Sequence, residues 1–166
     1  RYLVDEKLEL PIHMSGKSLL SPAAAWITMR MLERNPSPLP IRPQTSRGTP
    51  VAWKTGTSVG FKDSWAIGVF DRYILAVWIG NFSGEGNSAF IGRRMSGPLF
   101  FSIVDTILAD IPPAKRTPIA QKPVEVRSVP VCAVSGGIPN DWCPHKKPVW
   151  FIPGVSPITR CAIHRT

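Results

Sequence analysis

The middle of the chain holds three short apolar runs that read as strands. Residues 51–58, with the sequence VAWKTGTS, place Trp53 on one face of a strand and Lys54 on the other. Residues 64–70 alternate large and small apolar side chains, and residues 73–79 are more continuously apolar. Because only short turns separate these runs, the pattern predicts an antiparallel meander with the 51–58 strand at one edge.

Apolar residues at helical spacing predict one helix before this meander and one after it. Ser21-Pro22 is typical of a helix start, with serine at the N-cap and proline at the first helical position, and Asn35-Pro36 ends that helix. The second helix starts at Ser96 and carries an apolar stripe that we expect to cover the sheet, with Ala66 and Gly68 leaving room for it. The sequence therefore predicts an α+β fold, an antiparallel sheet flanked by helices.

The remaining segments are predicted to be irregular or extended. Residues 1–12 mix apolar and charged side chains around a proline, which favours extended or hairpin structure. Residues 35–50 are rich in proline, and residues 80–94 are rich in glycine and serine, which is typical of loops.

Composition narrows the possible partners. The chain has 166 residues, of which 43% are apolar, so it can form one domain or one domain with a small appendage. Its net charge of +9 favours anionic surroundings. No run of Arg and Lys is interleaved with stacking aromatics, which argues against nucleic-acid binding. The chain begins at Arg1 and has no apolar run of about 18 residues that could span a bilayer, so we expect it to be a piece of a longer protein.

The C-terminal part has a different character. Residues 112–130 are rich in proline and basic residues and are predicted to be a linker. Residues 131–166 contain all three cysteines, Cys132, Cys143 and Cys161. Such a short segment buries little core, so we expect it to depend on a covalent or metal staple, or on its neighbours.

Two kinds of staple compete for these cysteines. The spacing C-x10-C-x-H followed by C-x2-H could supply three thiolates and one histidine to a tetrahedral zinc ion, although the short C-x2-4-C knuckle is missing. A disulfide between two of the three cysteines is the other staple. A third possibility is that all three remain free thiols.

The chemistry of residues 51–58 suits an anionic ligand. The Lys54 ammonium with neighbouring hydroxyls can bind a carboxylate. Gly56 leaves the backbone bare where a ligand could lie along the strand, while Thr55, Thr57 and Ser58 supply hydroxyls and amides around it. The plainer interpretation is a strand end followed by a polar turn.

Wider sequence context favours the functional interpretation. Lys54-Thr55-Gly56 is one of three motifs of penicillin-binding proteins and class A β-lactamases. With the flanking stretches 19–27 (LLSPAAAWI) and 61–69 (FKDSWAIGV), the chain resembles the late transpeptidase region of the bifunctional class A penicillin-binding proteins. The resemblance covers about residues 1 to 165 and is most specific over residues 53–78.

This resemblance implies an organisation and a function. Residues 1–111 would be the C-terminal half of a transpeptidase domain with a partial β-lactamase-like fold, followed by the linker 112–130 and the tail 131–166. The intact protein would be a peptidoglycan D,D-transpeptidase and glycosyltransferase that cross-links stem peptides through an acyl-enzyme and reacts with β-lactams. The resemblance implies no cofactor and no catalytic metal.

Specific roles are implied for the 51–58 strand. Lys54 and Thr55 would hold the carboxylate of the donor peptide or of a β-lactam, and the backbone amide of Thr57 would be one oxyanion donor. Gly56 would let the substrate pair with the strand edge. Ser58 is included among the substrate-binding residues.

The sequence departs from the family in one decisive respect. No serine has a lysine three positions later, and there is no S-x-N, so the nucleophile motif S-x-x-K and the second motif are missing. We therefore expect this chain alone to be inactive and to need the upstream half of the same protein. A sheet face left uncovered without that half could lead to self-association.

The resemblance also implies a location. The upstream part of the family carries the membrane anchor, which places the protein at the periplasmic face of the bacterial inner membrane. Oxidising conditions there favour the disulfide over the zinc site and over free thiols. The alternative function is a noncatalytic binding module of the cell envelope; a serine hydrolase of another fold is disfavoured because no G-x-S-x-G elbow is present.

Overall fold

The computed structural model describes residues 18–44 and 46–165, so the structure predicted for residues 1–12 lies outside the described residues. Two α-helices, one short 3-10 helix and five strands follow one another along the described chain. Their bounds are α1 Pro22–Leu32, β1 Val51–Thr57, β2 Asp63–Phe70, β3 Tyr73–Gly80, α2 Ser96–Ala109, η1 Pro113–Lys115, β4 Arg127–Cys132 and β5 Lys146–Phe151. The fold is a small α+β arrangement of two helices with one three-stranded and one two-stranded antiparallel sheet.

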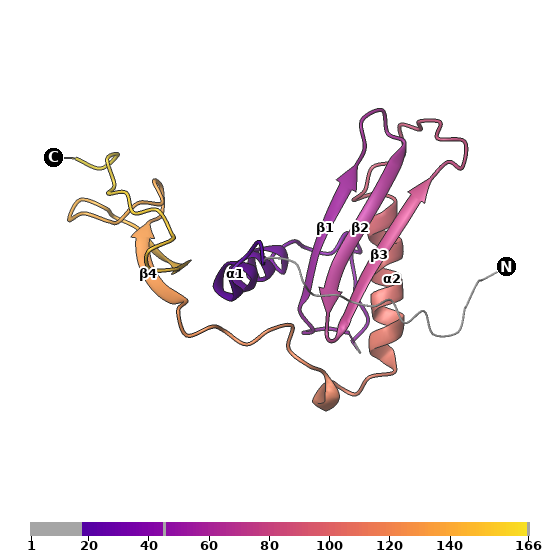
Figure 1. Ribbon diagram of the computed structural model, residues 1–166, viewed down its shortest axis with the longest axis horizontal. Coiled ribbons are helices and arrows are strands. Elements are labelled where there is room, and N and C mark those ends of the chain that lie inside the picture. Colours follow the sequence, from indigo (N-terminus) through magenta and orange to yellow (C-terminus); the bar gives the residue numbers. More distant parts are fainter. Residues whose placement is uncertain (1–17, 45, 166) are drawn as a thin grey trace.

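The larger sheet is the predicted meander. Its strand order is β1-β2-β3, with both pairs antiparallel, so β1 is an edge strand as the sequence predicted. Lys54 lies opposite Ile67 of β2, and Thr57 lies opposite Ser64. Figure 1 shows α2 running along one face of this sheet.

The main core lies between that face and α2. Phe100, Phe101, Val104 and Leu108 of α2 are buried against the sheet, at helical spacings that put them on one stripe. Gly68 of β2 lies under this stripe, where an added Cβ would come within 2.7 Å of the Phe100 ring and of a backbone oxygen. A larger residue would push the helix away from the sheet, so the predicted role of the small β2 residues in close packing is confirmed.

Helix α1 begins where the sequence predicted. The Ser21 hydroxyl accepts a hydrogen bond from the Ala24 amide at 3.2 Å, and Pro22 occupies the first helical position. In Figure 1 α1 lies beside the β1 edge, whereas α2 covers the face, so the helices flank the sheet in two different ways. After α1, Asn35 and Trp53 exchange side chain to backbone hydrogen bonds of 2.9 and 3.0 Å, which fix the chain to the beginning of this edge.

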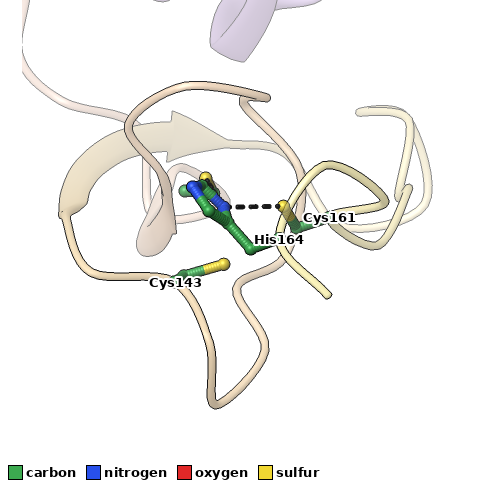
Figure 2. A group of neighbouring side chains, drawn as sticks. Cys143, Cys161 and His164 are labelled. Carbon is green, nitrogen blue, oxygen red and sulfur yellow. Dashed lines mark hydrogen bonds between the residues drawn. The ribbon is translucent and has the colours of Figure 1, made fainter. Parts of the chain in front are cut away.

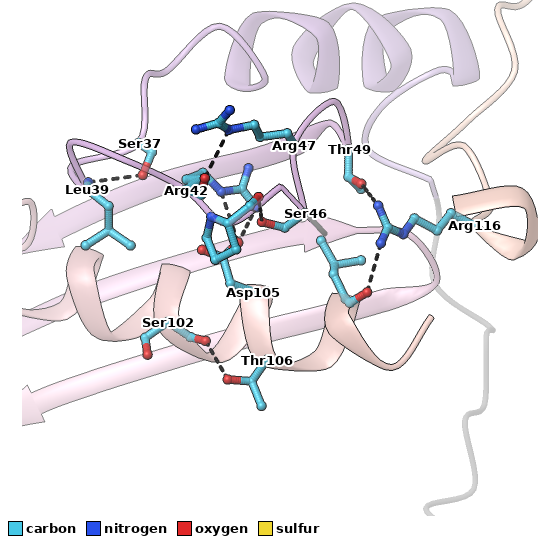
Figure 3. Close-up of polar contacts among 12 residues, drawn as sticks. Ser37, Leu39, Arg42, Ser46, Arg47, Thr49, Ser102, Asp105, Thr106 and Arg116 are labelled. Carbon is cyan, nitrogen blue, oxygen red and sulfur yellow. Dashed lines mark hydrogen bonds and ion pairs between the residues drawn. The ribbon is translucent and has the colours of Figure 1, made fainter. Parts of the chain in front are cut away.

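Two arginines tie the loop before β1 to α2 (Figure 3). Arg42 donates from Nε and Nη2 to the buried Asp105 carboxylate, at 3.0 and 2.6 Å. Arg116 donates to the Leu108 and Ile111 carbonyls at the end of α2, and also to the Thr49 hydroxyl at 2.7 Å. Because helix-end carbonyls lack partners within the helix, Arg116 both caps α2 and holds the entry to β1.

The C-terminal tail rests on α1. Strand β4 begins at Arg127, inside the predicted 112–130 linker, and pairs with β5 as a hairpin. The Trp26 and Trp150 rings meet edge to face at 5.1 Å, while Val126 and Ile152 complete a small apolar cluster with α1. The tail therefore packs on a neighbouring element, and its expected dependence on a staple or on its neighbours stays a prediction. No helix in the described ranges has the length and apolar character needed to cross a membrane.

Glu33, which follows α1, makes folding stability depend on pH. Its Oε1 is buried without a hydrogen-bond partner in the described chain, and burial raises the pKa of this carboxyl although Arg30 at 2.8 Å partly opposes the shift. The folded chain thus holds this proton more tightly than the unfolded chain, so the associated stability is present at low pH and is lost as pH rises through the raised pKa.

Replacing Glu33→Gln should remove this loss. We expect the free energy of unfolding, measured by urea denaturation between about pH 4 and about pH 8, to fall less with rising pH than in the original chain. Glu85→Gln is the control, because the Glu85 side chain is exposed and should leave the profile unchanged. Identical slopes for all three proteins would contradict this account.

Candidate functional site

The two faces of β1 carry different chemistry. The Trp53 ring packs on Phe100 and Phe101 of α2, so Thr55 and Thr57 share its face by the period of two. Lys54 and Gly56 are on the opposite face and are exposed. As predicted, the apolar anchor Trp53 and the lysine Lys54 lie on opposite faces, and both belong to β1.

The backbone of β1 presents hydrogen-bonding groups at its free edge. The Trp53 carbonyl accepts from Asn35 rather than from β2, while the Ser58 amide donates in the other direction, to the Asp63 carbonyl at 3.0 Å. Because peptide groups alternate in direction along a strand, the N–H and C=O groups of Thr55 and Thr57 point away from β2. Asn35 closes this edge at Trp53, and the exposed part begins after it.

Lys54 brings a positive charge to the same edge. Its Nζ donates to the Thr55 carbonyl at 2.7 Å, so the ammonium is folded back over the outward peptide groups. Among the described residues, the ion pairs join Arg30 to Glu33, Arg42 to Asp105 and Arg72 to Asp71, and none includes Lys54. Within the described ranges, the Lys54 ammonium is therefore a cation without an acidic partner.

The hydroxyls near the end of β1 support the loops around it. Thr57 Oγ1 accepts from the Gly92 amide at 3.1 Å, and the Gly92 carbonyl accepts from the buried Ser96 hydroxyl, which also bonds to Ser64. Ser58 Oγ accepts from the Lys62 and Asp63 amides at 3.1 and 2.8 Å. These hydroxyls have structural partners, so a role of Ser58 in substrate binding stays a prediction.

Gly92 was missed by sequence reasoning, which saw only a glycine-rich loop. An added Cβ there would lie 2.8 Å from the Gly56 carbonyl and 2.9 Å from the Thr55 Cβ. Only glycine lets this loop approach the strand so closely. The loop before α2 thus braces the end of β1 from the side opposite Lys54.

The sheet face that carries Lys54 is apolar and uncovered by the described residues. The side chains of Trp65, Ile67, Ile74 and Trp78 point to it, and between 39% and 78% of their surface is exposed. The Trp65 and Trp78 rings lie 6.4 Å apart on neighbouring strands. A contiguous apolar face of this kind is typical of a surface that another part of a protein covers.

A second candidate site lies in the tail. Cys132, Cys143, Cys161 and His164 turn their ligand atoms toward one another, with all four atoms within 4.8 Å of each other. Figure 2 shows Cys143, Cys161 and His164 in this group. All three cysteines are buried free thiols, so the disulfide favoured from sequence is not formed in this structure.

The thiols of this cluster differ in acidity. Hydrogen bonding from the His164 backbone amide is the largest of the effects that lower the pKa of Cys161 to about 5. Burial raises the pKa of Cys143, and hydrogen bonding to Cys161 raises the pKa of His164.

The tail also contains an apolar groove that sequence reasoning did not find. It has a volume of about 590 Å³ and lies between the β4-β5 hairpin and the segment around residues 156–159. Its lining includes Val129, Val131, Ile138, Val149, Trp150 and Ile158. No sequence signal identified the groove, because its walls come from segments that meet only in the folded tail.

Comparison with known proteins finds a family match in the tail and similar proteins along most of the chain. Residues 122–166 match the family described as "Penicillin-binding protein 1A, C-terminal domain". Penicillin-binding protein 1C of Escherichia coli (strain K12) is 32% identical over 158 residues, which cover 93% of this chain and 19% of that protein.

Two relatives from other bacteria show a similar extent of likeness. Penicillin-binding protein 1A of Clostridium perfringens is 29% identical over 88% of this chain and 18% of its own length. Penicillin-binding protein 1A of Clostridium tetani is also 29% identical, over 95% of this chain and 20% of its own length. The chain thus spans about a fifth of the length of the curated relatives that it matches.

Proposed function

We propose, on the premise that this chain belongs to the C-terminal region of the class A penicillin-binding proteins, that β1 forms the carboxylate-binding wall of a D,D-transpeptidase cleft. The cleft would act on peptidoglycan stem peptides. The observation that carries the proposal is the Lys54 ammonium, which has no acidic partner in the described chain and lies over the outward peptide groups of β1.

Lys54 and Thr55 bind the terminal carboxylate of the donor peptide. In the free chain the ammonium donates to the Thr55 carbonyl, a neutral acceptor that a carboxylate can replace with a stronger, charge-assisted hydrogen bond. The carboxylate of a β-lactam offers the same group to the same cation. Binding therefore needs only a rotation of one exposed side chain.

The free edge of β1 orients the rest of the substrate. An extended peptide laid beside residues 55–57 can exchange hydrogen bonds with the outward groups of Thr55 and Thr57, while Gly56 keeps the exposed face clear. The Thr57 amide then lies near the scissile carbonyl and stabilises the oxyanion of the tetrahedral intermediate. Catalytic roles in this chain thus fall to Lys54 and Thr57.

The serine nucleophile, its base and the second oxyanion donor come from the upstream half of the same protein. This chain contains neither S-x-x-K nor S-x-N, so it neither hydrolyses nor transfers peptide alone. The uncovered face around Trp65 and Trp78 is where that half would pack. Without it, copies of the chain would associate through this face, and a monomer at high concentration in solution would count against that expectation.

The intact protein would also be a glycosyltransferase at the periplasmic face of the inner membrane, anchored by its upstream part. Its transpeptidase step needs no cofactor, because a serine acyl-enzyme forms and breaks by acyl transfer alone.

Intact-mass measurement after incubation with a β-lactam tests the proposal. We expect an adduct on the chain joined to its upstream half and none on residues 1–166 alone, because the nucleophile lies upstream. An adduct on the isolated chain would show a nucleophile within it and would overturn the division of roles. No adduct on either protein would overturn the transpeptidase proposal.

A noncatalytic binding module of the cell envelope is the second candidate function. The apolar groove of the tail, with Trp150 in its lining, favours it because ligand-binding pockets are concave and lined mainly by hydrophobic and aromatic side chains. Cosedimentation with purified peptidoglycan distinguishes the two candidates. Retained binding without any acylation of the joined protein would favour the module.

A further inference from the structure

Four side chains from three separate segments meet in the tail. Cys132 ends β4, Cys143 lies in the loop between β4 and β5, and Cys161 and His164 lie beyond β5. Cys132, Cys143 and Cys161 are at most 7% exposed and form a buried cluster of their own. Three buried thiols and one imidazole at a common point need a chemical explanation, because sulfur atoms pack there without a surrounding apolar core.

The distances fit a tetrahedral metal ion. His164 Nδ1 lies 3.4 Å from both Cys132 Sγ and Cys161 Sγ. A tetrahedron with Zn–S bonds of about 2.3 Å and Zn–N bonds of about 2.0 Å places neighbouring sulfur and nitrogen ligands about 3.5 Å apart. All four ligand atoms lie within 4.8 Å of one another, so only small side-chain movements separate this arrangement from metal-ligand geometry.

We propose that Cys132, Cys143 and Cys161 through Sγ, and His164 through Nδ1, bind one Zn²⁺ ion in a closed structural site. Binding replaces the three thiol protons, which pass to solvent, by three Zn–S bonds, and the imidazole binds as the neutral base. Four protein ligands leave no open position for water, so the ion has a structural and not a catalytic role.

Groups around the four ligands hold them in place. The Asn140 amide donates to Cys143 Sγ at 3.4 Å, and Asn140 Nδ2 donates to the carbonyls of His164 and Cys161 at 2.9 and 3.4 Å. One asparagine thus joins the loop of the second ligand to the segment of the third and fourth. Such outer-shell hydrogen bonds orient ligands in metal sites.

Gly137 brings the ligand segments close together. An added Cβ would lie 2.8 Å from the Thr159 carbonyl and 3.1 Å from the Cys161 amide nitrogen, which are backbone atoms that cannot rotate away. The bridge between Ile138 and Arg160 continues this contact. The fold itself therefore brings Cys161 up to the turn that follows Cys132.

Charge also suits a zinc ion here. Three thiolates and one Zn²⁺ leave a net charge of −1, and the tail carries Lys146 opposite Cys132 in the hairpin, with Arg160 and Arg165 beside the last two ligands. A disulfide would use only two of the converging sulfur atoms and would leave the third buried thiol and the half-buried imidazole without a function.

Zinc would close two loops of the tail, from Cys132 to Cys143 and from Cys143 to Cys161. The tail has little apolar core that could hold these loops together otherwise. The described tail has one two-stranded sheet and buries few large side chains, which is the situation in which metal binding provides the folding energy. The closed tail in turn keeps Trp150 against Trp26 of α1.

Metal analysis of the purified chain tests the proposal. Under reducing conditions without added metal chelator, we expect inductively coupled plasma mass spectrometry to find about one zinc ion per chain. Cys143→Ser and His164→Ala should each lower the zinc affinity at least about 10-fold, because each removes one of four ligands. His145→Ala is the matched control, because His145 is exposed and two residues from Cys143 but outside the cluster.

Cobalt substitution and chelation test the site in the unaltered chain, so the result does not depend on whether the ligand variants fold. The unaltered chain loaded with Co²⁺ should show the absorption of tetrahedral cobalt with thiolate ligands, and a strong chelator should lower the thermal midpoint of the tail while adding Zn²⁺ restores it. Zinc retained by both ligand variants would identify an adventitious ion and overturn the proposal. A zinc-free native chain with a mass lower by about 2 Da would identify a disulfide and overturn it equally.

Discussion

Replacing Lys54→Ala in the chain joined to its upstream half should slow acylation by a β-lactam about 10-fold to 100-fold. A hydrogen bond to a charged group contributes about 1.5 to 3 kcal/mol, and this substitution removes the cation that would hold the ligand carboxylate. The Lys54 side chain is exposed and donates its hydrogen bond to the adjacent Thr55 carbonyl, so the folded state should tolerate its removal. The second-order acylation rate is the quantity to measure.

Lys62→Ala provides a control with the same change in net charge. Lys62 is exposed and lies in the turn between β1 and β2, where only its backbone amide bonds to Ser58. The acylation rate of the Lys62→Ala variant should stay within about twofold of that of the original protein, because an exposed charge away from the site contributes little to ligand binding in water. Equal slowing in both variants would attribute the effect to net charge and would remove Lys54 from the proposed carboxylate site.

Replacing Trp53→Ala should destabilise the chain by about 3 to 5 kcal/mol, as expected for truncating a large buried aromatic residue. Trp53 is 1% exposed, and its ring packs against Phe100 and Phe101 at centroid distances of 6.0 and 4.9 Å. Its Nε1 also donates to the Asn35 carbonyl at 3.0 Å. Urea denaturation followed by circular dichroism measures the loss.

Two further variants make this prediction specific. Trp53→Phe keeps most of the ring contact but loses the indole N–H, so it should lower the free energy of unfolding by about 1 to 3 kcal/mol. This variant can still be measured if the alanine variant does not fold. Trp142→Ala removes an indole that is 58% exposed in the tail and should cost less than about 0.5 kcal/mol. Similar losses for Trp53→Ala and Trp142→Ala would show that the β1–α2 core does not hold the fold.

Stability and proposed function meet in β1. Trp53 anchors the strand to α2, and Lys54 is the next residue on the opposite face. Asn35 and Gly92 brace the same strand at its edge and at its end. A binding group on a strand fixed from several sides loses little conformational freedom when it meets its ligand, which is the usual advantage of placing a site on a rigid element.

Local signals explain which elements could be predicted. The Ser21-Pro22 start of α1, the short turns of the meander and the apolar stripe of α2 depend on residues near one another in sequence. The alternation that separates Trp53 from Lys54 is equally local, and the match of Lys54-Thr55-Gly56 to a known motif needs no structure.

The sequence by itself determined the meander, the two helices and the Lys54 strand at an edge, because strand and helix periods act over a few residues. Only the tertiary structure decided that Arg42 pairs with Asp105, that Trp150 packs on Trp26 and that Cys132, Cys143, Cys161 and His164 converge. The spacing of the cysteines left disulfide, zinc and free thiols open. These contacts join segments that are far apart in sequence, and they form only when the whole chain between them folds. A pattern of neighbouring residues therefore cannot predict them.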